Sequence, residues 1–191
     1  MSNLTVNTFR EWKDTFNGIS EAVVQAAIDA AEEFANDFCG RVFTVAGGTA
    51  SARLYVPRLS DVLDIHDCTT VTAVTQSGVA VSSSDYQLEP VNGLTRAGDY
   101  APYRTIRLLG SNWSPDGAKA VVSVTATWGW SALPDRYYEA VKIMAADILE
   151  QREIRNGVVG FSEYGGVRVK ANPMATMLLQ RLARAESIGI A

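Results

Sequence analysis

Cys39-Gly40-Arg41-Val42-Phe43 is the stretch of sequence that decides the fold, because the hydrophobic pattern changes there. Before it, apolar residues recur at helical spacing, and after it they alternate with polar residues as in strands. A second change follows Trp128-Gly129-Trp130, where Pro134 is placed to open a helix. The sequence therefore predicts helices on both sides of a β-rich middle.

Two helices are predicted before the first junction. The first carries Phe9, Trp12 and Phe16 on one face, and the second is capped by Ser20 and ended by Gly40. The apolar stripe of the second helix is expected to pack against the helix that follows the second junction. The expected core of this helical frame consists of Val24, Ile28, Phe34, Phe38, Val141, Met144 and Ile148.

The middle of the chain predicts a mainly antiparallel sheet, because its short strands are joined by polar turns such as Ser77-Gly78. The strands are expected at residues 52–56, 62–65, 71–75, 86–88, 103–109 and 120–128. After it we expect a helix from about Pro134 to Arg152, a hairpin over 158–170 that turns at Gly165-Gly166, and a last helix capped by Asn172.

The fold class is therefore expected to be α+β. A chain of 191 residues favours one domain. Within residues 1–191 we expect a helical frame from 1–41 and 131–156, an inserted β-rich middle from 42–130, and a C-terminal hairpin and helix from 157–191.

Charge is unevenly distributed along the chain. The formal net charge is −4, which argues against a surface built to neutralise phosphates. Residues 152–191 hold six basic and three acidic side chains, whereas the rest of the chain carries −7. The basic tail either steers towards an acidic partner or consists of ordinary helix-end and surface charges. The N-terminus lacks an export signal and no apolar run is long enough for a membrane span.

No set of residues forms a recognisable catalytic, metal or cofactor site. His66 is the single histidine, and a dyad with Asp64 or Asp67 would still need a nucleophile. Cys39 and Cys68 lack a partner at metal-ligand spacing. The sequence therefore predicts no catalysis and no cofactor, and an enzyme that uses His66 stays a minor alternative.

The aromatic residues leave a second alternative open. Trp113, Tyr100 and Tyr103 fall in or beside expected loops, where rings of this kind stack on sugars or other small ligands. This pattern is compatible with a carbohydrate-binding or small-ligand-binding β module. Trp128 or Trp130 is expected in the core, and Trp113 is expected to make a loop contact.

The order of these parts resembles the head-tail connector proteins of tailed bacteriophages, the head-completion or head-to-tail adaptor family. The resemblance is carried by the helix that runs into residues 39–43, by Trp128-Gly129-Trp130 before Pro134 and Ala140, and by the glycine-rich segment 157–169. It extends over nearly the whole chain, although the middle at about 50–112 is larger than in the short connectors.

The resemblance implies a structural virion protein without catalytic activity. Copies would form a homo-oligomeric ring, twelvefold in the virion, under the portal protein at the head-tail junction, after synthesis in the host cytoplasm. The ring would extend the DNA channel without sequence-specific DNA binding or membrane contact and would dock a stopper or tail protein. The portal contact would involve Met174, Leu178, Leu179, Arg181, Leu182 and Arg184.

Overall fold

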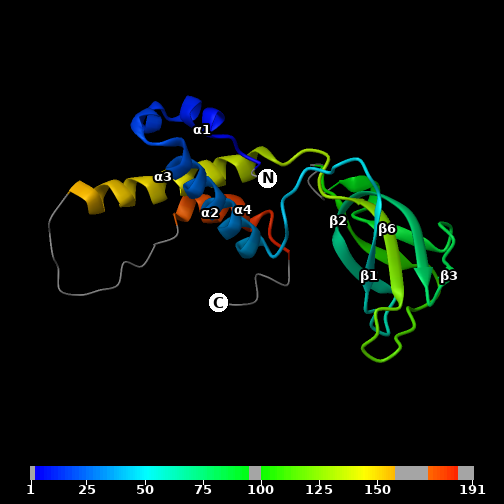
Figure 1. The fold of residues 1–191 in the computed structure, drawn as a ribbon. Coiled ribbons are helices and arrows are strands. Elements are labelled where there is room, and N and C mark those ends of the chain that lie inside the picture. Colours follow the sequence, from blue (N-terminus) through cyan, green and yellow to red (C-terminus); the bar gives the residue numbers. More distant parts are fainter. Residues whose placement is uncertain (1–2, 95–99, 158–171, 185–191) are drawn as a thin grey trace. The chain divides into compact units, whose positions relative to one another are not determined.

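A computed structural model describes residues 3–94, 100–157 and 172–184 of the chain. The chain divides into two compact units: a helical unit from residues 1–41 and 133–191, and a β unit from residues 42–132 (Figure 1). Helices and a mainly antiparallel sheet both contribute, so the predicted α+β class is confirmed. The hairpin expected at 158–170 lies outside the described residues.

The helical unit is built around two long helices. These are α2 (Glu21–Cys39) and α3 (Asp135–Gly157), which pack against each other. The short helix α4 (Pro173–Gln180) packs mainly against α3 and also contacts α2 (Figure 1). The N-terminal segment adds α1 (Val6–Trp12) and the 3-10 helix η1 (Asp14–Gly18).

The prediction of one continuous first helix is wrong. Lys13 has extended dihedral angles (φ −143°, ψ 99°), so the chain leaves α1 before it forms η1. Phe9 and Phe16 are nevertheless buried and stack with ring centroids 5.5 Å apart. Trp12 is 41% exposed, and its ring centroid lies 5.9 Å from that of Phe9.

Fewer residues of α2 are buried than its apolar pattern in the sequence predicts. Val24 and Ile28 are fully buried, and so is Val141 of α3, with Met144 9% exposed. Phe34 was expected in this core, but its side chain is 43% exposed and lies over Phe38 with ring centroids 6.1 Å apart. Phe38 and Ile148 are half-buried. Because the helix advances by about 100° per residue, Phe34 falls beside the buried arc of Val24, Ile28, Ala31 and Ala35.

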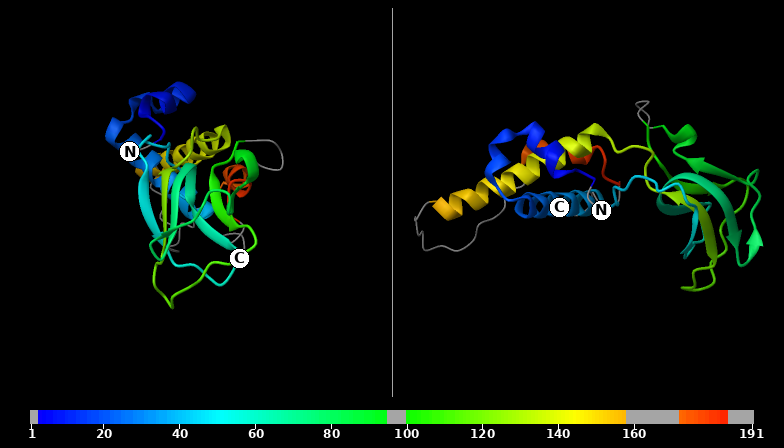
Figure 2. Two further views of the ribbon diagram at one scale, coloured as in Figure 1. Left: turned by 90° about the vertical axis from the view of Figure 1, so that its right-hand side faces the viewer. Right: turned by 45° about the horizontal axis from the view of Figure 1, so that its top comes forward.

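The β unit contains one antiparallel sheet in the order β1-β6-β2-β5-β4, with β3 paired to β2. Its strands are β1 (Ser51–Tyr55), β2 (Val62–Gln76), β3 (Val79–Ala80), β4 (Tyr86–Glu89), β5 (Tyr103–Leu108) and β6 (Val122–Trp128), with the 3-10 helix η2 (Val91–Gly93) after β4. The sheet curls around its own core (Figure 2). That core consists of Leu63, Ile65, Cys68, Val74, Ile106, Leu108, Trp113, Val122, Val124 and Ala126.

β2 joins two strands that the sequence analysis kept apart. Residues 62–65 and 71–75 lie in one 15-residue strand, whose first part pairs with β5 and whose second part pairs with β6. Register shifts between Asp64 and Cys68, and again before Thr70 and Ala73, interrupt the period of two. The alternation expected of one strand is therefore lost in the sequence although the strand continues.

The two chain segments that enter and leave the β unit lie side by side. Thr44 O accepts from the Trp130 amide at 2.8 Å, and Trp130 O accepts from the Ala46 amide at 2.8 Å. Phe43 stacks on Trp130 with centroids 5.4 Å apart. Gly129 has φ +112°, and a Cβ there would lie 2.5 Å from Thr44 O. The glycine between the two tryptophans is therefore required by the close approach of the two segments.

Candidate assembly surfaces

The exposed face of α4 is the first candidate surface. Asn172 caps the helix by accepting from the Met174 amide at 3.0 Å, and Pro173 fills the first turn. Met174 and Met177 are 55% and 58% exposed. Together with the half-buried Leu178 and the exposed Arg181 they fall at i, i+3, i+4 and i+7 of one face. This face combines flexible apolar side chains with one cation.

The opposite face of α4 belongs to the fold. Leu179 is fully buried and Leu182 is 8% exposed. Both were among the residues expected at the portal, and the helical unit uses them for its own packing. Of the six residues expected there, Met174 and Arg181 are exposed, and Leu178 and Arg184 are partly buried.

The C-terminal end of α4 is tied to the end of α2. Cys39 Sγ lies 3.6 Å from Leu179 O, and Arg41 donates to Leu182 O at 2.9 Å. The Arg184 amide donates to Cys39 O at 3.0 Å. Gly40 permits this arrangement, because its left-handed conformation (φ 59°) ends α2 and its amide donates to Asn36 O and Asp37 O. The Cys-Gly-Arg junction therefore positions α4, a role that its sequence did not indicate.

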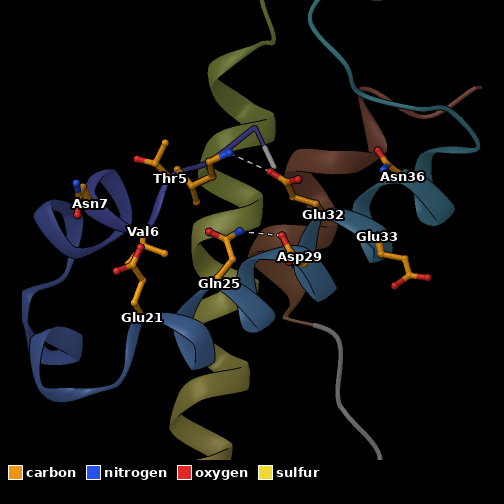
Figure 3. A pocket seen from close by; sticks show the side chains of 10 residues that line it. Thr5, Val6, Asn7, Glu21, Gln25, Asp29, Glu32, Glu33 and Asn36 are labelled. Atoms are coloured by element: carbon orange, nitrogen blue, oxygen red, sulfur yellow. Dashed lines mark hydrogen bonds between the residues drawn. The ribbon is translucent and has the colours of Figure 1, made fainter. Parts of the chain in front are cut away.

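An acidic groove of about 770 Å³ runs along the other side of α2 (Figure 3). Glu32, 8% exposed, accepts from the amides of Asn3 and Leu4 at 2.8 and 3.0 Å. The hydroxyl of the fully buried Tyr137 accepts from the Asn3 side chain at 3.3 Å. Burial, with a contribution from the Glu32 carboxylate, raises the pKa of Tyr137 above its usual range. The groove is lined by Leu4, Thr5, Val6, Asn7, Glu21, Gln25, Asp29, Glu32, Glu33 and Asn36.

The buried Glu32 carboxylate therefore holds the N-terminal segment against α2. The other acids give this side of the helical unit a negative surface. In the described part of the chain, no group of three or more His, Cys, Asp or Glu side chains is arranged to hold a metal ion.

His66 lies in an aromatic cluster of the β unit. The Tyr55 hydroxyl is 2.7 Å from His66 Nδ1 and 3.2 Å from its backbone amide. The rings of Tyr55 and His66 both lie near Trp128, and the Arg53 guanidinium lies 4.4 Å from the Trp128 ring centroid. Trp128 Nε1 also donates to Ser51 O at 2.9 Å. Asp64 accepts from Thr105 at 3.3 Å. His66 thus lies beside a phenol. This pair is not the histidine–nucleophile pair of a serine hydrolase.

Trp113 corrects a second expectation. Its side chain is fully buried among the core residues, and its amide donates to Ser60 O at 2.8 Å. The ring therefore cannot stack on a ligand from solvent, whereas Tyr100 is 44% exposed. The core assignment holds for Trp130, which is 3% exposed, and Trp128 is half-buried. The ligand-binding alternative loses the residue on which it mainly depended.

The chain shares its fold with chains from the neck of a gene transfer agent particle. It is similar to a chain of the "Neck of native GTA particle computed with C12 symmetry", with TM-score 0.54 and 21% identity over 93% of this chain and 87% of that one. It is also similar to a chain of the "Neck of empty GTA particle computed with C6 symmetry", with TM-score 0.56 and 22% identity over 94% and 89%. GTA denotes a gene transfer agent.

The resemblance to head-tail connectors is therefore confirmed at the level of the fold. No family model matches the chain, and no curated protein matches it in sequence. Among the described helices, none is long and apolar enough to cross a membrane.

Proposed function

We propose that this protein is a structural head-to-tail adaptor of a phage-like particle. The observation that carries the proposal is the similarity in fold to neck proteins over more than nine-tenths of the chain. Copies assemble as a ring under the portal, twelvefold in the virion, with the helical and β units acting as one connector domain. The ring extends the DNA channel and presents a docking surface to a stopper or tail protein.

The proposed role needs no chemistry from the chain. The described residues offer a buried cysteine in each unit and a histidine held by tyrosine, and we assign no catalytic role to any of them. The acidic balance of the chain suits a channel for DNA, because a wall rich in fixed cations would hold the polyanion by counterion release. Synthesis in the host cytoplasm and location at the head-tail junction follow from this role.

We assign the portal contact to the exposed face of α4. Met174, Met177 and Leu178 can fill an apolar groove, since methionine adapts to irregular surfaces, and Arg181 can orient the helix against an acidic wall. Leu179 and Leu182, on the opposite face of α4, are buried in the helical unit and hold the helix in place. The assignment thus keeps the helix expected from the resemblance, retains Met174, Leu178 and Arg181, and adds Met177.

The test is assembly with the portal ring of the same particle. Met177→Glu places a carboxylate in the apolar face, and we expect it to weaken portal binding at least about tenfold, which corresponds to about 1.4 kcal/mol. Gln180→Glu is the matched control, because it adds the same charge at an exposed position outside this face. The mass of portal complexes across a concentration series gives the readout.

Either of two results contradicts the proposal. Equal binding by Met177→Glu and Gln180→Glu removes the portal contact from α4. A wild-type chain that stays monomeric and indifferent to the portal removes the adaptor function itself.

A further inference from the structure

Two loops of the β unit expose leucine side chains. One loop, residues 56–61, joins β1 to β2, and the other, residues 109–113, follows β5. Leu59 is 77% exposed, more than any other large apolar side chain in the described part of the chain, and Leu109 is 52% exposed. Single exposed leucines are common, whereas grouped apolar side chains mark places where another molecule binds. Neither leucine contributes to the core of the β unit, so both are available to a partner.

The two loops are joined to each other by backbone hydrogen bonds. Ser60 O accepts from the Trp113 amide and Asp61 O accepts from the Leu108 amide, both at 2.8 Å. The Trp113 side chain is fully buried in the core of the β unit, so it anchors the second loop. The exposed leucines, each next in sequence to a residue that makes one of these bonds, are therefore held near one another.

Leu59 is presented by a turn that two hydrogen bonds hold in place. The Ser60 amide donates to Arg58 O at 2.8 Å, which closes a three-residue turn with Leu59 at its centre. The Ser60 hydroxyl accepts from the Val62 amide at 3.1 Å and fixes the turn to the start of β2. Tight turns favour small or polar residues, so the turn itself does not call for leucine. A preformed turn loses little entropy on binding, and this one is suited to place Leu59 in a pocket of a partner.

The charges beside these leucines fit a protein partner better than a nucleic acid. Arg107 pairs with both Asp61 and Glu89, so these two carboxylates are neutralised within the β unit. Arg58 is exposed and directly precedes Leu59. One cation beside an apolar side chain does not make the basic stripe that a phosphate backbone needs. It fits a protein surface with an apolar pocket and a carboxylate at the rim.

We infer that the two loops dock the next protein on the tail side of the ring. The inference rests on the proposed adaptor function, which needs one contact with the portal and another with the following protein. The portal contact is assigned to the helical unit, which leaves the β unit for the second contact. The surface, which we call the loop patch, consists of Arg58, Leu59 and Leu109.

The strand register separates the loop patch from the segments that enter and leave the β unit. Cys68 pairs with Trp128, next to those segments, and also with Tyr103 at the start of β5. The joined loops adjoin Leu108 at the other end of β5, about 17 Å further along that strand. A partner can therefore contact the loop patch without displacing the segments that connect the two units.

Leu59→Glu tests the inference directly, because it puts a carboxylate where the partner's apolar pocket is expected. Leu94→Glu is the matched control, since Leu94 is also exposed (45%) and lies after η2, outside the loop patch. The assay adds purified tails and the remaining neck proteins of the same particle to DNA-filled heads that carry the variant ring. We expect Leu59→Glu to bind the portal normally and to lower the joined fraction at least about tenfold. Leu94→Glu heads should join as wild-type heads do.

Arg58 supplies a second test through charge alone. Arg58→Glu should lower joining as Leu59→Glu does, because it turns the expected attraction to a carboxylate into repulsion. Arg58→Lys keeps the positive charge and should join nearly as well as the wild type. In all four variants the buried Cys68 should be labelled at the wild-type rate, which shows that the β unit remains folded.

Two results overturn the inference and leave the adaptor function standing. The first is normal joining by heads that carry Leu59→Glu. The second is a Leu59→Glu chain that binds the portal but no longer fills the ring, because the loop patch would then be a contact between copies.

The two proposals fail separately. If the wild-type chain ignores the portal, the adaptor function fails, and the loop patch is then tested by binding of the free chain to the same tail and neck proteins. Saturable binding that Leu59→Glu weakens and Leu94→Glu keeps would support the loop patch. A wild-type chain that binds none of these proteins would overturn it.

Discussion

The helical unit and the β unit are held together in different ways. In the helical unit, buried polar groups join segments far apart in the sequence: Glu32 holds the amides of Asn3 and Leu4, and Cys39 O accepts from Arg184. In the β unit, the central cluster is apolar and the strands are joined by their backbone ladders. The first arrangement depends on a few individual side chains, whereas the second distributes its hydrogen bonds over many residues.

This difference bears on the proposed portal contact. The portal face on α4 depends on the end of α2, so a disturbance of α2 reaches that face. Each unit also contains one buried cysteine, Cys39 or Cys68, and burial raises the pKa of both thiols to about 12. Thiol labelling at neutral pH therefore reports the opening of each unit separately.

The largest expected effect is a cavity in the helical unit. Ile28 is fully buried in α2, so Ile28→Ala should cost about 2–5 kcal/mol of its free energy of unfolding. Cys39 should then be labelled at least about thirtyfold faster while Cys68 keeps its wild-type rate. Ile148→Ala, at a half-buried position, should have a smaller effect. A cost under about 0.5 kcal/mol at Ile28 would contradict the described core.

An effect of intermediate size is expected where the segments that enter and leave the β unit lie side by side. Gly129→Ala puts a Cβ 2.5 Å from Thr44 O at φ +112°, and neither backbone can move aside cheaply. We expect a cost of about 1–3 kcal/mol, seen as faster labelling of Cys68 with Cys39 unchanged. Gly47→Ala is the control, because a Cβ there meets nothing within 4 Å. Equal labelling rates in the two variants would show that the crossing is not strained.

Local signals in the sequence predicted much of this fold. Gly40 ends α2 and Asn172 caps α4 as expected, because one residue's backbone geometry determines each of these ends. β6 is found within its predicted range because Val122, Val124 and Ala126 alternate with polar residues over a regular strand. In such elements the local sequence and the tertiary contacts agree.

The errors come from contacts between distant segments. The burial of Trp113 depends on a loop held by Ser60, and the burial of Leu179 and Leu182 depends on packing that involves the end of α2. No local pattern distinguishes these side chains from exposed ones. The register that aligns Leu54 with Ser123 and Thr75 likewise exists only in the assembled sheet.

The smallest expected effect tests the buried hydrogen bonds of Glu32 in the helical unit. Glu32→Gln keeps an acceptor for the amides of Asn3 and Leu4 but removes its charge, and a neutral hydrogen bond contributes about 1 kcal/mol less than a charged one. We expect a loss of about that size, with exchange of these two amides and labelling of Cys39 both faster and Cys68 unaffected. Glu33→Gln, at an exposed neighbouring position, is the control and should change neither rate. If the two variants behaved alike, the N-terminal segment would be held by the packing of Leu4 and Val6 and not by the charge of Glu32.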